Sequence, residues 1–236
     1  MSYADNTYEN PYSVAHASVD DRADFITKTY LHLAGAVGVF AGIEFALLNS
    51  PFADMFVNML GNNRFAWFMV LGVFMVVSWV ANSWASSNAS VGMQYMGLLL
   101  YVVAEAVIFV PLLTIASRFG GSSVIPMAGI ATGVLFLSMT AIVFITRKDF
   151  SFLRSILMFG GFAALGLIAV SIFFQFSLGP IFAYLMVAFA CAYILYYTSN
   201  VLHHYQVGQH VAASLALFAS VALLFWYLVQ IFMSRR

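Results

Sequence analysis

Glu105 stands out chemically in this sequence, because it places a carboxyl group near the middle of an apolar stretch at residues 91–116. An ionised side chain at the centre of a membrane helix costs about 2.5 kcal/mol or more, so such residues usually face the interior of a bundle or pair with a partner. Two interpretations follow. Glu105 is a ligand for an ion or proton on a path through a bundle, or it is a protonated acid that a neighbouring hydroxyl group satisfies.

Three polar residues in the last third of the chain are candidates to line the same path: Tyr197, Asn200 and Ser220. A helix would place Tyr197, Asn200 and His204 on one face, because they are spaced at i, i+3 and i+7. Tyr196 and Tyr205 lie beside them, and these tyrosines fit an aromatic belt at a membrane–water interface equally well.

The lysines and histidines argue against two other kinds of membrane protein. A retinal-binding photoreceptor needs a lysine deep in its last helix, but the lysines here are Lys28 and Lys148. A membrane zinc hydrolase needs several ligands that converge inside the bilayer, whereas His32 is the one histidine well inside an apolar stretch. The three histidines between residues 203 and 210 are expected to form a solvated loop cluster, with metal binding as the alternative.

Serine hydroxyl groups occur within apolar stretches at Ser138, Ser171 and Ser220. None has a general base nearby in its own stretch, so we expect each to donate a hydrogen bond to a backbone carbonyl or a neighbouring helix rather than to act as a nucleophile. The sequence therefore predicts no catalytic residue, no resident metal ion and no cofactor.

The composition places these residues in a lipid bilayer. Of the 236 residues, 63% are hydrophobic and 8% are charged, whereas a soluble domain carries about 25% charged residues. The formal net charge is zero, which leaves no basic surface for a nucleic acid. A soluble enzyme, a nucleic-acid-binding protein and a disordered chain are therefore excluded.

Seven apolar stretches are long enough to cross a bilayer as helices, since a hydrocarbon core of about 30 Å needs about 20 helical residues. They lie at residues 25–48, 65–84, 91–116, 124–145, 152–174, 180–202 and 211–233. The sequence thus predicts an all-α integral membrane bundle of seven helices. Besides Glu105, three charged residues fall inside these stretches: Lys28, Glu44 and Arg154. Each is within five residues of an end, so we expect it to reach the headgroups.

The polar, acidic residues 1–24 are expected to form a flexible tail outside the membrane domain at residues 25–236. Positive charges favour a cytoplasmic amino terminus weakly, mainly through the short loop that contains Arg147 and Lys148. Two small-residue patterns, Gly38 with Gly42 and Gly129 with Gly133, are expected to seat neighbouring helices of one monomer rather than a dimer.

Three segments carry a family resemblance. The string TRKDFSFL at residues 146–153, the string ILYYTSNVLH at residues 194–203 and the Lys28-Thr29-Tyr30 entry to the first stretch resemble the Bax inhibitor-1/YccA family. The resemblance is strongest from about residue 124 onward. It implies a seven-helix bundle in a bacterial inner membrane, a cytoplasmic amino terminus, no enzymatic activity, and a family motif loop formed by Arg147, Lys148 and Asp149.

Two functions follow from this resemblance. Some family members are described as pH-sensitive calcium leak channels in which two aspartates share a proton, but Tyr197 and Ser220 occupy those positions here, which weakens a leak of Ca²⁺ or H⁺. The YccA-like branch also has a serine at the second position, and its members bind an FtsH-type membrane AAA protease that can seize their amino-terminal tail. We therefore favour modulation of such a protease, with the leak as the alternative.

Overall fold

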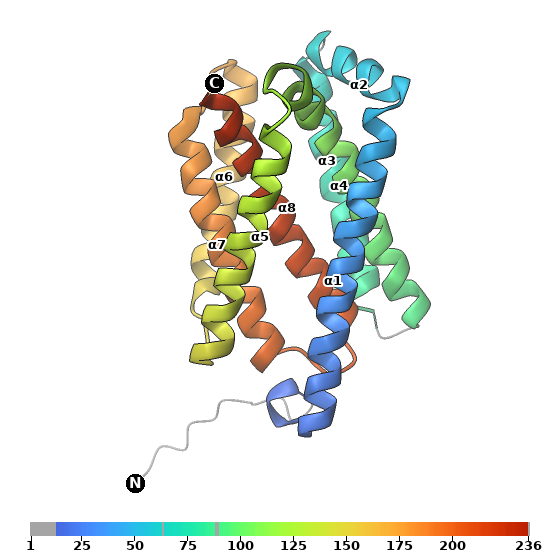
Figure 1. The fold of residues 1–236 in the computed structure, drawn as a ribbon, viewed down its shortest axis with the longest axis vertical. Helices are drawn as coiled ribbons and strands as arrows, with labels where there is room; N and C mark the ends of the chain where they lie inside the picture. The colour runs from blue at the N-terminus through green and yellow to red at the C-terminus, as the bar shows by residue number, and fades with distance from the viewer. Residues whose placement is uncertain (1–12, 63, 88–89, 236) are drawn as a thin grey trace.

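The computed structural model describes residues 13–62, 64–87 and 90–235, and within them the chain is helical (Figure 1). A short 3-10 helix, η1 (Val14–His16), precedes eight α-helices: α1 (Val19–Leu48), α2 (Pro51–Asn62), α3 (Arg64–Ala85), α4 (Val91–Phe119), α5 (Val124–Thr146), α6 (Leu153–Phe174), α7 (Gly179–His203) and α8 (His210–Ser234). Seven of these helices, all except α2, are long and apolar enough to cross a membrane. The predicted seven-helix membrane bundle is confirmed.

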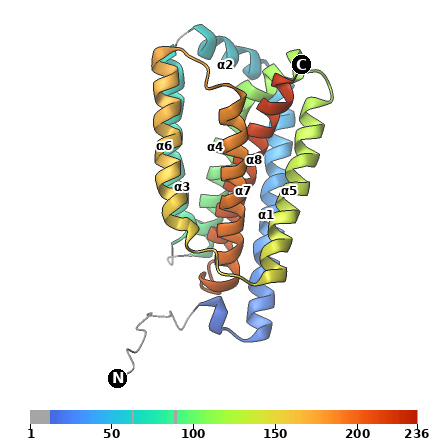
Figure 2. The same ribbon diagram turned by 90° about the vertical axis from the view of Figure 1, so that its left-hand side faces the viewer.

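The bundle is organised around α4 and α8, which together contain half of the buried residues among those described. Helix α8 packs against α1, α4, α5 and α7, and the long helices run alternately up and down (Figures 1 and 2). Helix α6 stands at the edge of the bundle (Figure 2), and Leu157 is its buried residue. The rest of α6 therefore faces the lipid or lies only partly covered.

Helix α1 begins at Val19, six residues before the predicted start. The side chain of Ser18 caps the helix by accepting a hydrogen bond from the amide of Asp21 at 3.1 Å. The boundary predicted at residue 24 therefore falls inside a helix, and residues 1–12 of the predicted tail lie outside the described residues. Thirty residues at about 1.5 Å each make α1 about 45 Å long, more than the hydrocarbon core of a bilayer.

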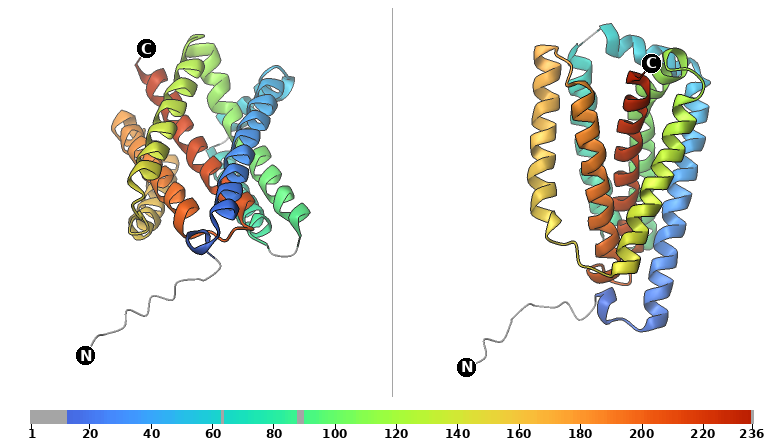
Figure 3. Two further views of the ribbon diagram at one scale, coloured as in Figure 1. Left: turned by 60° about the horizontal axis from the view of Figure 1, so that its bottom comes forward. Right: turned by 60° about the vertical axis from the view of Figure 1, so that its left-hand side comes forward.

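Helix α2 was not predicted, because its 12 residues lie in a stretch that is too short to cross a bilayer. It lies across one end of the bundle, at the end opposite η1 (Figures 2 and 3). Its buried side chains, Ala53, Phe56 and Leu60, join Val110 of α4 in one apolar cluster, while Met55 and Met59 on the other face are exposed. The helix is thus an amphipathic cover for this end.

Close helix packing occurs at a different glycine from those predicted. A Cβ atom on Gly97 would lie 2.5 Å from the carbonyl oxygen of Ala81, so α3 and α4 approach each other through this residue. Gly38, Gly42, Gly129 and Gly133 have no neighbouring atom within 4 Å of such a Cβ. The prediction that these four glycines seat neighbouring helices of the monomer is wrong, because they lie on faces of α1 and α5 that point away from the core.

Candidate functional site

Glu105 is buried in the interior of the bundle, with 8% of its surface exposed. Its Oε1 atom accepts a hydrogen bond of 2.9 Å from the hydroxyl group of Tyr101, one turn earlier on α4. The ring of Tyr101 packs against Phe218 of α8 and Phe74 of α3, with centroid distances of 6.2 and 6.0 Å. The carboxyl group is thus turned away from the lipid, and a hydroxyl group of its own helix satisfies one oxygen.

The other predicted path residues lie in the bundle but are bonded elsewhere. Ser220 donates a hydrogen bond of 2.9 Å to the carbonyl of Ala216. Tyr197 stacks on Tyr193 with a centroid distance of 5.8 Å. The backbone carbonyl of Asn200 ends α7 by accepting hydrogen bonds from the amides of residues 204 and 205. Among the described residues, none of these three side chains forms a hydrogen bond with the carboxyl group of Glu105.

The predicted role of the membrane serines is confirmed. Ser138 donates to the carbonyl of Val134 at 2.7 Å, and Ser171 donates to the carbonyl of Ile168 at 2.8 Å. Together with Ser220, these hydroxyl groups are engaged by their own helices. Such bonds satisfy a hydroxyl group in lipid and leave it poorly placed for attack on a substrate.

An aromatic layer separates Glu105 from the α2 end of the bundle. Phe40 of α1 meets Phe109 of α4 edge-on at 5.1 Å and Phe218 of α8 at 5.9 Å. Phe109 follows Glu105 by one helical turn, so Phe109 and Phe40 lie on the α2 side of the carboxyl group, while Phe218 also contacts Tyr101.

A second buried carboxyl group, that of Glu44, lies on the other side of this layer. Glu44 follows Phe40 by one turn on α1 and is 4% exposed. Neither of its carboxyl oxygens has a hydrogen-bond partner among the described residues. The prediction that Glu44 reaches the headgroups is wrong, because α2 covers the end of α1. The sequence spacing could have predicted this burial. The buried residues of α1 recur every three or four positions and so form one face of the helix: Phe25, Thr29, Leu33, Ala36, Phe40 and Glu44.

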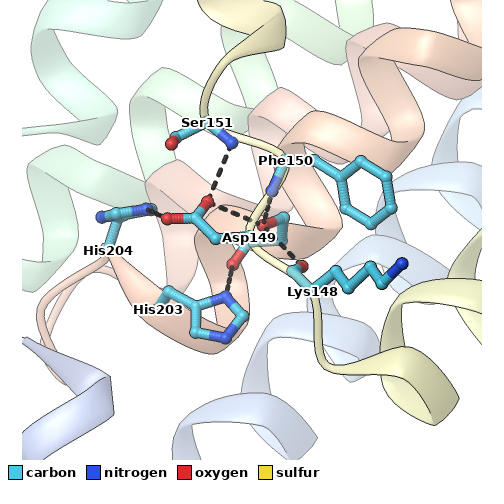
Figure 4. A network of polar contacts seen from close by, with 7 residues as sticks. Lys148, Asp149, Phe150, Ser151, His203 and His204 are labelled. Carbon is cyan, nitrogen blue, oxygen red and sulfur yellow. Dashed lines mark hydrogen bonds and ion pairs between the residues drawn. The ribbon is translucent and has the colours of Figure 1, made fainter.

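The family motif loop is fastened to the end of α7 (Figure 4). Asp149 accepts a hydrogen bond of 2.8 Å from the amide of Ser151, and its Oδ2 atom lies 3.0 Å from Nε2 of His204. Ser199 of α7 accepts a bond from the amide of Phe150 at 2.9 Å and donates to Asp149 at 3.3 Å. The loop therefore holds α5 and α6 against α7.

This network favours the ionised form of Asp149. Burial opposes ionisation, but the hydrogen bond from the Ser151 amide and the nearby His204 outweigh it, so the pKa of Asp149 lies below its ordinary value of 3.8. The chain turns into the loop at Arg147, which has a φ of 52°. The side chains of Arg147 and Lys148 are exposed. The three motif residues thus differ in role, since Asp149 contacts the bundle and the two basic residues face outward.

The first described residues are attached to the turn between α7 and α8. The amide of Val14 donates a hydrogen bond of 2.8 Å to the carbonyl of Tyr205, and Ser13 pairs with Gln206 in an antiparallel bridge. Val14 is fully buried, and the Arg22 guanidinium donates to the carbonyls of Val14 and Ala15. We call residues 13–16, held in this way, the amino-terminal anchor. Sequence patterns did not reveal the anchor, because Tyr205 and Gln206, to which it is attached, lie about 190 residues away.

Two histidines meet near the same end of the bundle. Nε2 of His32 lies 2.9 Å from the hydroxyl group of Tyr95, and its ring lies 5.1 Å from that of His210. The sequence placed His32 well inside an apolar stretch, but its partners Tyr95 and His210 lie in the first turns of α4 and α8, so it is level with the ends of those two helices. In the described part of the chain, no three His, Cys, Asp or Glu residues are grouped to hold a metal ion.

Comparison with known proteins assigns nearly the whole chain to one family. The sequence profile described as "Inhibitor of apoptosis-promoting Bax1" matches residues 22–236. An uncharacterized protein of Pseudomonas aeruginosa is 32% identical over 184 residues, which cover 77% of this chain and 75% of the relative. Bax inhibitor 1 of Schizosaccharomyces pombe is 28% identical over 237 residues, which cover 95% of this chain and 81% of the relative. Protein LIFEGUARD 4 of Arabidopsis thaliana is 34% identical over 141 residues, which cover 57% of this chain and 56% of the relative.

Proposed function

Because the chain belongs to the Bax inhibitor-1 family, we propose that it is a non-enzymatic protein of a bacterial inner membrane that binds a membrane AAA protease of the FtsH type and slows its proteolysis. The observation that supports this proposal is the amino-terminal anchor. A protease of this kind pulls on one end of its substrate, and residues 1–12 precede the anchor in the sequence.

The anchor resists such a pull in two ways. Extraction must expose the buried side chain of Val14, which costs about 1.5–3 kcal/mol, and must break the hydrogen bonds that Arg22 and Tyr205 make to the anchor. It must then unwind α1, whose buried face packs against α4 and α8. A protein held in this way occupies the protease for longer than an unanchored substrate does.

We place the η1 end of the bundle in the cytoplasm. Five basic residues lie at this end: Arg22, Lys28, Arg147, Lys148 and Arg154. Two of them lie in the short loop between α5 and α6, and positive charges in short loops favour the cytoplasmic side. This orientation exposes the segment before the anchor to a protease whose catalytic domain is cytoplasmic.

The test is co-purification of the full-length protein with the protease, followed by the rate of its degradation. We expect association with the intact chain, loss of degradation when residues 2–12 are deleted, and faster degradation of Val14→Asp and Arg22→Ala. Asp20→Asn, an exposed substitution in the first turn of α1, is the control and should behave as the parent protein does. Absence of any association, or equal degradation of the anchor variants and the control, contradicts the proposal.

A leak of cations or protons is the second candidate function, and the burial of Glu105 inside the bundle is the observation that favours it. Tyr197 and Ser220 supply no carboxylate pair, so Glu105 would be the acidic group on the path. Substitution of Glu105 by Gln retains the size and removes the charge. We expect this variant to reduce Ca²⁺ or H⁺ flux in liposomes, and an unchanged flux would contradict a leak through Glu105.

A further inference from the structure

Glu44 is a buried carboxylic acid that neither proposed function uses. It is 4% exposed, and both carboxyl oxygens lack a hydrogen-bond partner among the described residues. An isolated ionised carboxylate is far more costly to bury than a neutral polar group, so a buried acid with no cation beside it gives up its charge instead. The burial and the missing partners therefore favour the neutral acid, which holds a proton.

The surroundings exclude a divalent cation as the ligand. Calcium takes six to eight oxygen ligands. The apolar cluster at this end of α1, α2 and α4 includes Leu47, Ala53, Phe56 and Val110, and among the described residues no three His, Cys, Asp or Glu side chains are grouped to hold a metal ion. A single carboxyl group among such residues cannot replace the water shell of the ion, whereas a proton needs no further ligand.

Few other ionisable groups face this part of α1. Helix α2 carries Asp54, which forms an ion pair with Arg118 of α4. Glu105, also on α4, lies beyond the aromatic layer and is bonded to Tyr101. Between residues 211 and 234, α8 carries no charged residue, and its Tyr227 contacts Phe182 of α7. The protonation of Glu44 is thus set mainly by whether water reaches it.

Helix α2 is the short element beside this end of α1. Its buried face packs against Leu47 of α1, and the ion pair between Asp54 and Arg118 attaches it to α4. Both partners of the pair are about half exposed, and exposed ion pairs contribute little. A short amphipathic helix held mainly by the apolar side chains of Phe52, Ala53, Phe56 and Leu60 can lift and readmit water without unfolding the bundle.

We propose that Glu44 is a proton-binding site at the α2 end of the bundle, and that α2 docks over it when the proton is bound. Loss of the proton leaves a carboxylate that needs water, so the ionised form favours the lifted position of α2. The site is independent of protease binding at the opposite end and of any conduction past Glu105.

The experiment measures the accessibility of the buried face of α2 as a function of pH. Ala53 is 1% exposed and Met55, on the other face of the same helix, is 63% exposed. A cysteine is placed at each position in a Cys191→Ser background. The full-length protein is reconstituted in liposomes and labelled with a maleimide that is present on both sides of the liposome membrane. The Met55→Cys variant reports how pH alone changes thiol reactivity.

We expect the labelling rate of Ala53→Cys, divided by that of Met55→Cys, to rise with pH by up to about tenfold per pH unit, because the docked form holds one more proton than the lifted form. The same ratio should be flat with pH when Glu44→Gln is added, since Gln cannot ionise. A ratio that does not change with pH in the parent background overturns the proposal, and so does an equal rise in the Glu44→Gln background.

A second measurement keeps the proposal testable if Glu44→Gln does not fold. Glu44→Leu replaces the buried acid by an apolar side chain, a change that buried ionisable sites often tolerate. Infrared spectroscopy at neutral pH should show the carbonyl stretch of a protonated carboxylic acid in the parent protein, and its intensity should fall in Glu44→Leu. An unchanged band in that variant shows that Glu44 is ionised and overturns the proposal.

Discussion

Glu44 and Glu105 lie on opposite sides of one layer of aromatic rings. Each is one helical turn from that layer, on two helices that run in the same direction, so about 12 Å along the bundle axis separates them. The two acids also differ in their bonding, because Glu105 accepts a hydrogen bond and Glu44 has none from the described residues. This difference gives the first prediction.

Replacing Tyr101 by Phe should destabilise the protein by about 1–3 kcal/mol, because it removes the hydrogen bond to the buried oxygen of Glu105. Tyr227 is the matched control, since it is buried, its ring packs against Phe182 and its hydroxyl group makes no hydrogen bond to another described residue, so Tyr227→Phe should cost little or nothing. Thermal unfolding in detergent measures both. Equal losses for the two variants would show that the bond does not stabilise the fold.

Replacing Gly97 by Ala should cost about 1–3 kcal/mol, because the added methyl group would lie 2.5 Å from the carbonyl oxygen of Ala81 and would push α3 away from α4. The same change at Gly38 meets no atom within 4 Å, and Ala is a better helix former than Gly. Gly38→Ala should therefore unfold at the same temperature as the parent protein or a higher one. A loss of stability at Gly38 comparable to that at Gly97 would argue against this packing.

The pH dependence of stability should change in Asp149→Asn. Because the pKa of Asp149 is lower in the folded protein than its ordinary value of 3.8, its ionisation adds stability that is fully present above that value and is lost as the pH falls through the lowered pKa. The pair with His204 is about half exposed, so the contribution is at most about 1 kcal/mol. We expect the variant to unfold at a lower temperature near neutral pH, with a difference that shrinks in strong acid. A difference that stays constant down to strong acid would assign the effect to packing instead.

Loss of the Arg22 side chain should loosen the amino-terminal anchor. Arg22→Ala removes the donors to the carbonyls of Val14 and Ala15, so the amide of Val14 should exchange with deuterium faster. Arg118→Ala, at the opposite end of the bundle, is the control and should leave that amide unchanged. Slow exchange at Val14 in both variants would show that the bridge to Tyr205 holds the segment alone.

The membrane helices could be predicted from sequence because the signal is local. Each apolar stretch exceeds the length that a bilayer requires, and the observed helices differ from the predicted stretches mainly at their ends. Helix α2 was not predicted, because its twelve residues are fewer than the length of helix that crosses a bilayer. The misplacement of Glu44 follows from the same omission, since its distance from the end of α1 suggested exposure while the cover was unknown.

The candidate site was predictable only within single helices. Glu105 and Tyr101 are four residues apart, a spacing that brings side chains together on a helix. The bond between Asp149 and His204 joins residues 55 positions apart, and the anchor joins Val14 to Tyr205. Such contacts depend on how helices are ordered around α8, and hydropathy carries no information about that order.

The sparse packing of α6 has a consequence for how the protein responds to the surrounding bilayer. Helix α6, whose buried residue is Leu157, is held by a few contacts to α7, such as the hydrogen bond of 3.2 Å from the hydroxyl group of Tyr193 to the carbonyl of Leu157, and by the loops at its two ends. Sideways displacement of this helix exchanges one set of van der Waals contacts for a nearly equal set, so it costs little free energy. We therefore expect changes in the thickness or the acyl composition of the bilayer to displace α6 more than the helices at the centre of the bundle.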